Sequence, residues 1–207
     1  NKAAREMRQR VNRLLDTKAI KGLSISTFHS LGQRILLRES HRLGYRRGFS
    51  IMDSRDVELC LDALALRIEQ ETDYIRQTMY QISRWKNDFI DPETAAASAE
   101  DALSAGQARL YYEYQQHLLA CNSMDFDDLI MLPVQLFRQF PEVLNHWQDR
   151  VRYLLVDEYQ DTNVSQYEMV KALCDIRQKL TVVGDDDQSI YAWRGARPEN
   201  LQRLQQD

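Results

Sequence analysis

The run VRYLLVDEYQD at residues 151–161 decides the fold class of this chain. Its first six residues form a nearly continuous apolar segment, which is typical of a parallel strand buried on both faces. A second run of this kind, LTVVG, follows at residues 180–184. Between them Asn163 and Gln166 can form a capping box for a helix. Strand, helix and strand at this spacing predict a right-handed βαβ unit and therefore an α/β fold.

Two acids, Asp157 and Glu158, stand where the first of these strands ends. Open α/β sheets bind ligands at the carboxyl ends of their strands. In a nucleotide enzyme the first acid would hold Mg²⁺, usually through water. The second would orient and deprotonate an attacking water. The alternative is a strand followed by an acidic turn, because two apolar residues before Asp-Glu are a common pattern.

The second strand leads into GDDDQSIYAWRG at residues 184–195. Gln188 could reach a terminal phosphate. Tyr191 and Trp193 could stack on bases, with Arg194 nearby for a phosphate, and stacking of this kind tolerates any base sequence. The alternative is a turn that carries three acids, followed by a Trp in the core.

Further outward, LSISTF at residues 23–28 alternates and predicts a short strand. The segment after it, Ser26 to Ser30, offers small hydroxyls and backbone N–H groups at a helix start, which suit phosphate contacts. The alternative places Phe28 in the core and makes His29 a satisfied polar residue. An amphipathic helix is predicted before this strand, at residues 3–15.

The middle of the chain reads as helical. We expect a loop over residues 40–52 and an all-α block over residues 54–130, with no strand in it. Its predicted helices are a helix capped by Asp53 or Ser54, one through Ile75 and Trp85, one that begins at Asp91-Pro92, and one over 108–120.

Composition narrows the class of protein. The chain has 207 residues and a net charge of −4, and 43% of its residues are hydrophobic, which indicates a globular protein. Residues 1–50 hold 12 Lys or Arg against 3 Asp or Glu, so a net +9 segment precedes a net −13 remainder. A basic segment can be a phosphate-facing surface or a solvated helix face. Three scattered cysteines predict reduced thiols in a cytosolic protein, and the histidine spacing does not suggest zinc.

Taken together, these segments resemble the superfamily 1A DNA helicases, the UvrD/Rep/PcrA-like family. The resemblance covers the whole chain. It rests on segments in the family's order: NKAA at 1–4, TFHS at 27–30, DFDDL at 125–129, DEYQD at 157–161 and GDDDQSIYAWRGA at 184–196. The residues within and between these segments, including WKND at 85–88 and ARP at 196–198, look most similar to the Rep branch.

The resemblance implies an α/β fold with a RecA-like parallel sheet of the P-loop NTPase type, incomplete here, and an all-α insertion. Motor domain 1A would comprise residues 1–30 and 140–207, and insertion 1B residues 31–139. By the same resemblance Asp157 would bind Mg²⁺, Glu158 would be the catalytic base and Gln188 would sense the γ-phosphate. Gln160 and Asp161 would couple the nucleotide and DNA sites. The DNA channel would be lined by Asn1, Thr27, Phe28, His29, Tyr191, Trp193 and Arg194.

The implied parent protein is a cytoplasmic, ATP- and Mg²⁺-dependent 3′→5′ DNA helicase and translocase acting in replication or repair. Its implied partners are single-stranded DNA, single-strand/duplex junctions and the second motor domain of the same full-length chain, with no membrane. Two alternatives stay open: a RecB-like recombination helicase-nuclease subunit and a non-enzymatic DNA or protein docking module. No Gly-x-x-x-x-Gly-Lys-Ser/Thr occurs in the chain, and both ends look cut. We therefore expect a fragment without ATPase activity of its own.

Overall fold

The computed structural model describes residues 2–16, 18, 20–65, 72–174, 179–188, 196–197, 199–200 and 203. Most of them are helical, and two small parallel sheets complete an α/β fold. In chain order the elements are α1 (Lys2–Leu14), α2 (Phe28–Glu39), η1 (Ser40–Leu43), β1 (Ser50–Ile51), α3 (Ser54–Ala65), α4 (Thr72–Asn87), α5 (Pro92–Ala97), α6 (Ala102–Ala120), β2 (Ser123–Met124), α7 (Asp128–Gln139), α8 (Pro141–Arg150), β3 (Leu154–Val156), η2 (Tyr159–Asp161), α9 (Val164–Cys174), β4 (Leu180–Val182) and η3 (Asp186–Gln188).

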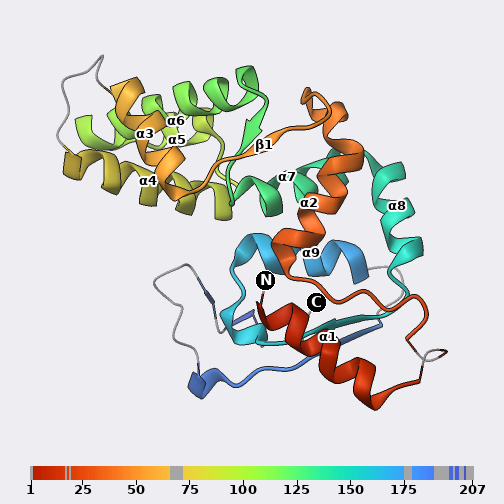
Figure 1. The fold of residues 1–207 in the computed structure, drawn as a ribbon. Helices are drawn as coiled ribbons and strands as arrows, with labels where there is room; N and C mark the ends of the chain where they lie inside the picture. Colours follow the sequence, from red (N-terminus) through yellow and green to blue (C-terminus); the bar gives the residue numbers. More distant parts are fainter. Residues whose placement is uncertain are drawn as a thin grey trace.

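Helices α3 to α6 form a lobe with its own hydrophobic core (Figure 1). That core includes Leu61, Ile82, Tyr111 and Tyr114, all of them buried. The predicted N-cap of α3 is present: the Asp53 carboxylate accepts the N–H groups of residues 55 and 56. The helices predicted for residues 54–120 are confirmed, although α6 begins six residues earlier than expected.

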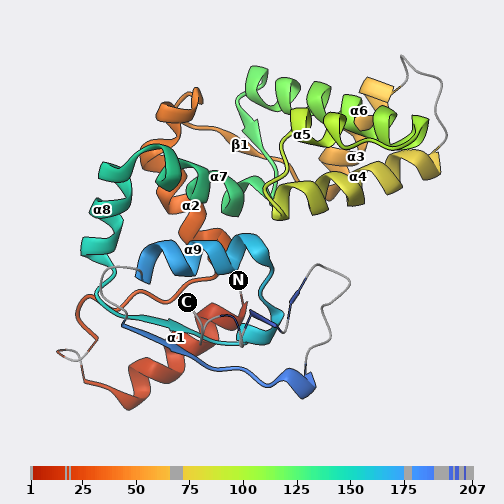
Figure 2. The same cartoon turned by 180° about the vertical axis from the view of Figure 1, so that it is seen from behind.

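Helices α2 and α7 lie between this lobe and the β3–β4 strands, and α9 lies between α7 and those strands in both views (Figures 1 and 2). The contact between α2 and α7 depends on Gly32, because a Cβ atom there would come within 1.7 Å of the carbonyl oxygen of Leu129. Pro133, one turn further along α7, has no N–H to donate to that carbonyl. A glycine on one helix therefore packs against the carbonyl that a proline leaves unpaired on the other.

The sheets correct several predictions. Leu23 to Thr27 is extended but pairs with no strand in the described part of the chain, so the predicted strand at 23–28 is wrong, and Phe28 already begins α2. The expected absence of a strand in 54–130 is also wrong, because Ser123 and Met124 pair in parallel with Ser50 and Ile51. These two-residue strands are too short for an alternating pattern to reveal them.

Strands β3 and β4 pair in parallel, as predicted, with Val156 opposite Val182. Their predicted burial on both faces is wrong. Val156 packs with Tyr159, Tyr167 and Val170 around α9, whereas Leu155 points to the other face and is 66% exposed. A two-stranded sheet covered by a helix on one side buries every second residue only.

A buried ion cluster fastens the start of α7 to α4. Lys86 is fully buried, and its Nζ lies 2.6 Å from Asp125 Oδ2 and 2.8 Å from Asp128 Oδ1. Tyr114 donates its hydroxyl to the same Asp125 oxygen at 2.9 Å. The backbone N–H groups of Asp125 and Asp128 each donate to the other residue's carboxylate. The one buried cation is thus shared by two carboxylates, and burial together with the charge of Asp125 raises the pKa of Asp128 to about 7.

Candidate functional site

The parallel pairing brings the two strand ends together. The pairing continues past the strands themselves, because Val183 N–H donates to the Val156 carbonyl at 2.8 Å and Tyr159 N–H donates to the Val183 carbonyl at 2.9 Å. The acids that follow β3 therefore lie beside the Gly184–Gln188 segment that follows β4. The sequence predicted this meeting from the rule that parallel strands present their carboxyl ends at one edge.

Asp157 and Glu158 are both exposed at this edge. One Asp157 oxygen accepts the N–H of Glu158 at 3.1 Å. Glu158 has φ 54° and ψ 44°, a left-handed conformation that costs energy for a residue with a side chain and is found disproportionately at functional sites. The sharp turn leaves both carboxylates at the strand end, open to a ligand.

Gln160 joins the two strand-end segments. Its side chain is buried, its Nε2 donates to Glu158 Oε2 at 2.8 Å, and its Oε1 accepts the N–H of Asp185 at 3.1 Å. Asp185 in turn accepts the Gln188 side-chain amide at 2.6 Å. The predicted residues Glu158, Gln160 and Gln188 therefore belong to one chain of hydrogen bonds, which passes through Asp185.

Two residues at these hydrogen bonds, Asp185 and Gly184, had no predicted role. Asp185 was noted only as one of three acids on a turn. Gly184 was noted only as a strand end, yet a Cβ atom there would lie 2.5 Å from Gln160 Oε1. A glycine directly after a buried strand is the available signal for such a close approach.

Asp161, the last residue of the DEYQD segment, points away from this chain of bonds. Its Oδ1 is buried and accepts no hydrogen bond from the described residues. Burial, helped by the charge of Glu158, raises the pKa of Asp161 above its ordinary value. Gln160 therefore belongs to the chain of hydrogen bonds and Asp161 does not, whereas the resemblance implied a coupling role for both.

The start of α2 carries the second group of predicted residues. Thr27 is the N-cap, and its Oγ1 accepts the N–H of Ser30 at 3.2 Å. Phe28 is half-buried against the two cores around α9, which favours the core alternative for its ring. His29 packs edge-on against Phe126 with ring centroids 5.7 Å apart, and burial lowers the pKa of His29. His29 is therefore a neutral ring beside an exposed aromatic residue.

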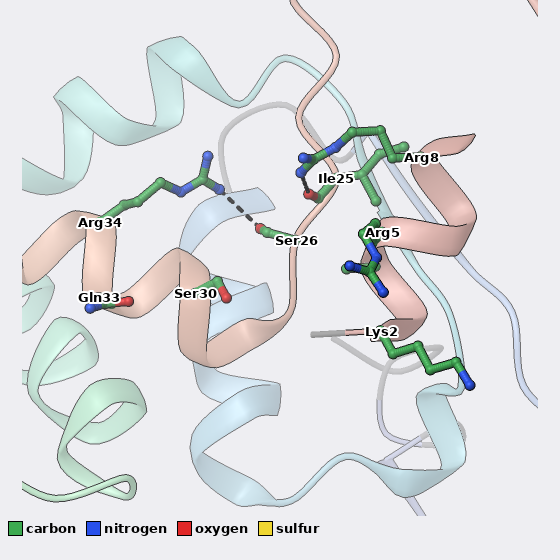
Figure 3. A pocket seen from close by; sticks show the side chains of 9 residues that line it. Lys2, Arg5, Arg8, Ile25, Ser26, Ser30, Gln33 and Arg34 are labelled. Atoms are coloured by element: carbon green, nitrogen blue, oxygen red, sulfur yellow. Dashed lines mark hydrogen bonds between the residues drawn. The ribbon is translucent and has the colours of Figure 1, made fainter. Parts of the chain in front are cut away.

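A basic cavity of about 560 Å³ opens between α1 and α2 (Figure 3). The residues around it include four cations and no acid; they are Lys2, Ala4, Arg5, Arg8, Ile25, Ser26, Ser30, Gln33 and Arg34. Arg34 donates to the hydroxyls of Ser24 and Ser26, and Arg8 donates to the Ile25 carbonyl. The sequence indicated this surface through its net positive charge and through the hydroxyls of Ser26 to Ser30, which were expected to suit phosphate contacts.

The remaining predicted site residues, Asn1, Tyr191, Trp193 and Arg194, lie outside the described residues. In the part of the chain that the structure covers, no three His, Cys, Asp or Glu side chains gather as a metal-binding group. A single exposed aspartate such as Asp157 suits Mg²⁺, which keeps most of its water and phosphate ligands. None of the described helices has the length and apolarity needed to cross a membrane.

Comparison with known proteins places the chain in a family. The family model described as "UvrD/REP helicase N-terminal domain" matches residues 1–207. The chain is similar to the ATP-dependent DNA helicase Rep of Escherichia coli strain K12 (52% identity) and of Salmonella typhimurium strain LT2 (51%), in each case over the whole chain and 31% of the relative. It is 41% identical to the ATP-dependent DNA helicase PcrA of Leuconostoc citreum, over the whole chain and 28% of that protein.

The chain thus spans about a third of the length of these curated relatives. The family model covers every segment on which the resemblance rested, from the first residue to the run after β4. With the strand-end acids, the buried Gln160 bridge and the basic cavity on the same α/β framework, this chain belongs to the UvrD/REP helicase family.

Proposed function

We propose that this chain supplies the Mg²⁺-binding and water-activating wall of the ATP site in a 3′→5′ single-stranded DNA translocase and helicase. The observation that carries the proposal is the hydrogen-bonded chain from Glu158 through Gln160 and Asp185 to Gln188. It joins a candidate base to a candidate phosphate sensor across two strand ends. The relatives' names, ATP-dependent DNA helicase, support the same reading.

In domain terms, residues 1–30 and 140–207 would be part of a RecA-like motor domain 1A, and residues 31–139 an insertion, 1B. The separate hydrophobic core of α3 to α6 supports an insertion with its own stability. The parallel β3–β4 pair with α9 packed on it supports a RecA-like half. The motor would work with a second motor domain of the same full-length chain.

The exposed Asp157 carboxylate fits a Mg²⁺ ion held mainly by water and phosphate oxygens, and the ion would neutralise charge on the β- and γ-phosphates. Glu158 would orient a water for in-line attack on the γ-phosphorus and accept its proton as the bond to the bridging oxygen breaks and ADP leaves. Gln160 would fix the Glu158 carboxylate through its 2.8 Å hydrogen bond. Gln188 would contact the γ-phosphate after release from Asp185.

Single-stranded DNA would cross the face that carries α1 and the start of α2. The four cations of the basic cavity suit backbone phosphates, and the exposed Phe126 beside His29 suits a base. Asn1, Tyr191, Trp193 and Arg194 would complete this channel, which would end at a single-strand/duplex junction. Arg34→Ala should weaken binding of oligothymidylate and lower the salt dependence by about one phosphate contact.

The experiment is a steady-state ATPase assay on the full-length protein, with and without oligothymidylate. We expect DNA-stimulated hydrolysis, and Glu158→Gln should lower kcat by about 10²- to 10⁴-fold, the range of a general base. The matched control is Glu168→Gln on α9, whose carboxylate pairs with Arg138 at the surface and faces no ligand. The proposal would be contradicted by hydrolysis that oligothymidylate does not stimulate, or by an unchanged kcat in Glu158→Gln.

Residues 1–207 alone should not hydrolyse ATP, because the chain contains no phosphate-binding Gly-x-x-x-x-Gly-Lys-Ser/Thr loop. Weak, salt-sensitive binding of single-stranded DNA should remain. Tryptophan fluorescence at low salt tests this, and an unchanged titration for Trp193→Ala would remove the stacking role of that residue.

A further inference from the structure

The last turn of α4 lies where the helical lobe meets α7 and α9 (Figure 1). The upstream part of this helix belongs to the lobe, with Ile75, Ile82 and Trp85 buried in its core. Its final residue, Asn87, and the next residue, Asp88, instead contact the part of the chain that carries the strand-end acids. One rigid helix therefore reaches from the lobe core to the candidate site.

Asn87 uses its whole side-chain amide. Its Nδ2 donates to the Ser83 carbonyl at 2.7 Å and to Asp127 Oδ1 at 3.1 Å. Its Oδ1 accepts from Asn163 Nδ2 and, at 3.1 Å, from the Ser165 hydroxyl. An amide has two donors and two acceptor lone pairs; both donors and one lone pair are used, and the single Ser165 proton is shared between Asn87 Oδ1 and Asn163 Oδ1, 3.0 Å away.

Asn163 and Ser165 stand at the start of α9, directly after the DEYQD segment. Asn163 forms the predicted capping box, in which its Oδ1 accepts Gln166 N–H and its N–H donates to Gln166 Oε1. Thr162, just before it, donates its hydroxyl to the Tyr159 carbonyl at 2.7 Å. The acid-bearing turn is therefore fixed at its downstream end by residues that Asn87 holds.

Asp88 adds a second contact to the downstream end of the acid-bearing turn. Its carboxylate pairs with Arg197 at 2.9 Å, and Arg197 N–H donates to the Thr162 carbonyl at 3.0 Å. Both side chains of the ion pair are partly exposed, and such pairs stabilise a fold by only about 0–1 kcal/mol. Its larger effect is on position, because it ties Arg197, and through it Thr162, to the end of α4.

The base of this junction is rigid. Lys86, next to Asn87, is fixed in the buried cluster with Asp125 and Asp128, and Asn87 itself bonds to Asp127 of the same loop. A movement of the lobe relative to the sheet must therefore act on Thr162 and the start of α9, or break these contacts.

We infer that Asn87 and Asp88 are positioning residues that link the helical lobe to the acid-bearing wall of the nucleotide site. The inference rests on the proposed function. Neither residue touches nucleotide in this role. Asn87 acts through Asn163 on the turn that carries Glu158, and Asp88 acts on the end of the same turn through Arg197 and its bond to Thr162. Their loss should lower the rate of DNA-stimulated hydrolysis and leave nucleotide binding unchanged.

The test uses the full-length protein and measures ATP hydrolysis with saturating oligothymidylate. Asn87→Ala should lower DNA-stimulated kcat about tenfold, and Asp88→Asn about threefold, the range in which residues between coupled sites act. KM for ATP and Kd for oligothymidylate should stay within about twofold of wild type. Arg197→Asp alone should resemble Asp88→Asn, and the exchanged pair Asp88→Arg with Arg197→Asp should recover about half or more of wild-type kcat.

The matched control is Glu142→Gln, which breaks the pair of Arg42 and Glu142, of similar length and exposure but far from the junction. It should leave every parameter unchanged. Three results would overturn this inference but not the proposed function, provided that DNA stimulates hydrolysis by the wild type. They are variant kcat values within twofold of wild type, a rise of KM for ATP in parallel with the fall of kcat, and no recovery of kcat in the exchanged pair. Absence of DNA stimulation in the wild type would remove the proposed function and this inference with it.

Discussion

Two regions of the molecule carry closely spaced acids, and they treat them in opposite ways. In the Asp125–Asp128 loop the carboxylates of Asp125 and Asp128 are buried and paired with a fully buried lysine. At the strand ends Asp157 and Glu158 are exposed, and their carboxylates accept hydrogen bonds from one backbone N–H and one glutamine side chain. In the first arrangement the carboxylates bind a lysine inside the protein and do not reach solvent. The second holds them in position and leaves them available.

The difference shows that a motif of acids does not by itself identify a ligand site. Both segments contributed to the resemblance with the helicase family, and both are rich in carboxylates. Position in the fold separates them, because the first loop begins a helix packed against α4, whereas the second leaves the carboxyl end of a strand. Each of the changes below tests one side of this contrast.

The largest expected effect is on the buried cluster. Lys86→Met should lower the free energy of unfolding of residues 1–207 by about 3–5 kcal/mol, because two carboxylates are left buried without a cation. Urea denaturation at pH 7 measures this. A loss below about 1 kcal/mol would mean that the cluster does not depend on the pairing.

The same variant should invert the pH dependence that Asp125 contributes. Asp128 differs, because burial and the charge of Asp125 raise its pKa to about 7, so its contribution to stability already increases as pH falls in the wild type. Burial alone would raise the pKa of Asp125, but Lys86 holds it below its ordinary value, so the wild-type contribution is present at neutral pH and is lost as pH falls. Without Lys86 the pKa rises above that of the unfolded chain, and stability from this group increases as pH falls. The deficit of the variant should therefore shrink between about pH 7 and pH 4.

Gly184→Ala should cost less, about 1–3 kcal/mol, because the new methyl group displaces the buried Gln160 amide. The displaced amide would release both Asp185 N–H and Glu158, so in the full-length protein kcat should fall together with stability. Wild-type kcat in a destabilised protein would show that Glu158 does not need Gln160.

Asn163→Ala should cost about 1 kcal/mol, the usual value of a lost N-cap. It removes the capping box of α9 and one partner of Asn87. Thermal unfolding of residues 1–207 measures the change. Gln166→Ala is the matched control, since it opens the same box but keeps the bond to Asn87, and it should cost less.

The smallest effect is expected on the open face of the sheet. Leu155→Thr should change the free energy of unfolding by no more than about 0.5 kcal/mol, because the side chain is 66% exposed and Thr suits a strand. Val156→Thr, its buried neighbour, is the contrasting substitution and should destabilise clearly. Equal losses at the two positions would mean that both faces are covered.

Much of this fold could be predicted from the sequence, because amphipathic spacing and cap residues act locally. Asp91 before Pro92 and the Asn163–Gln166 box both mark real helix starts. No helix was predicted for residues 131–150, which α7 and α8 largely occupy and which contain two prolines. Pro141 opens α8, and Pro133 is tolerated inside α7, where its missing N–H faces the Gly32 contact.

For the site, the sequence predicted which residues lie together but not the side-chain contacts between them. Residue order placed Asp157, Glu158 and Gln188 at one sheet edge, since parallel strands end together. The bridge through Gln160, the close approach of Gly184 and the anchoring of Asn163 by Asn87 depend on side chains that are distant in the sequence. Those contacts are set by packing, which local patterns do not encode.

The open face of the β3–β4 pair also affects how the isolated chain should behave in solution. Each of these strands has a single neighbour in the described part of the chain, and Tyr153, Leu155 and Val183 are exposed beside two free edges. Unpaired edges next to apolar side chains template intermolecular strand addition. Residues 1–207 should therefore self-associate as their concentration rises, and a lysine in place of Leu155 should suppress this association and improve solubility.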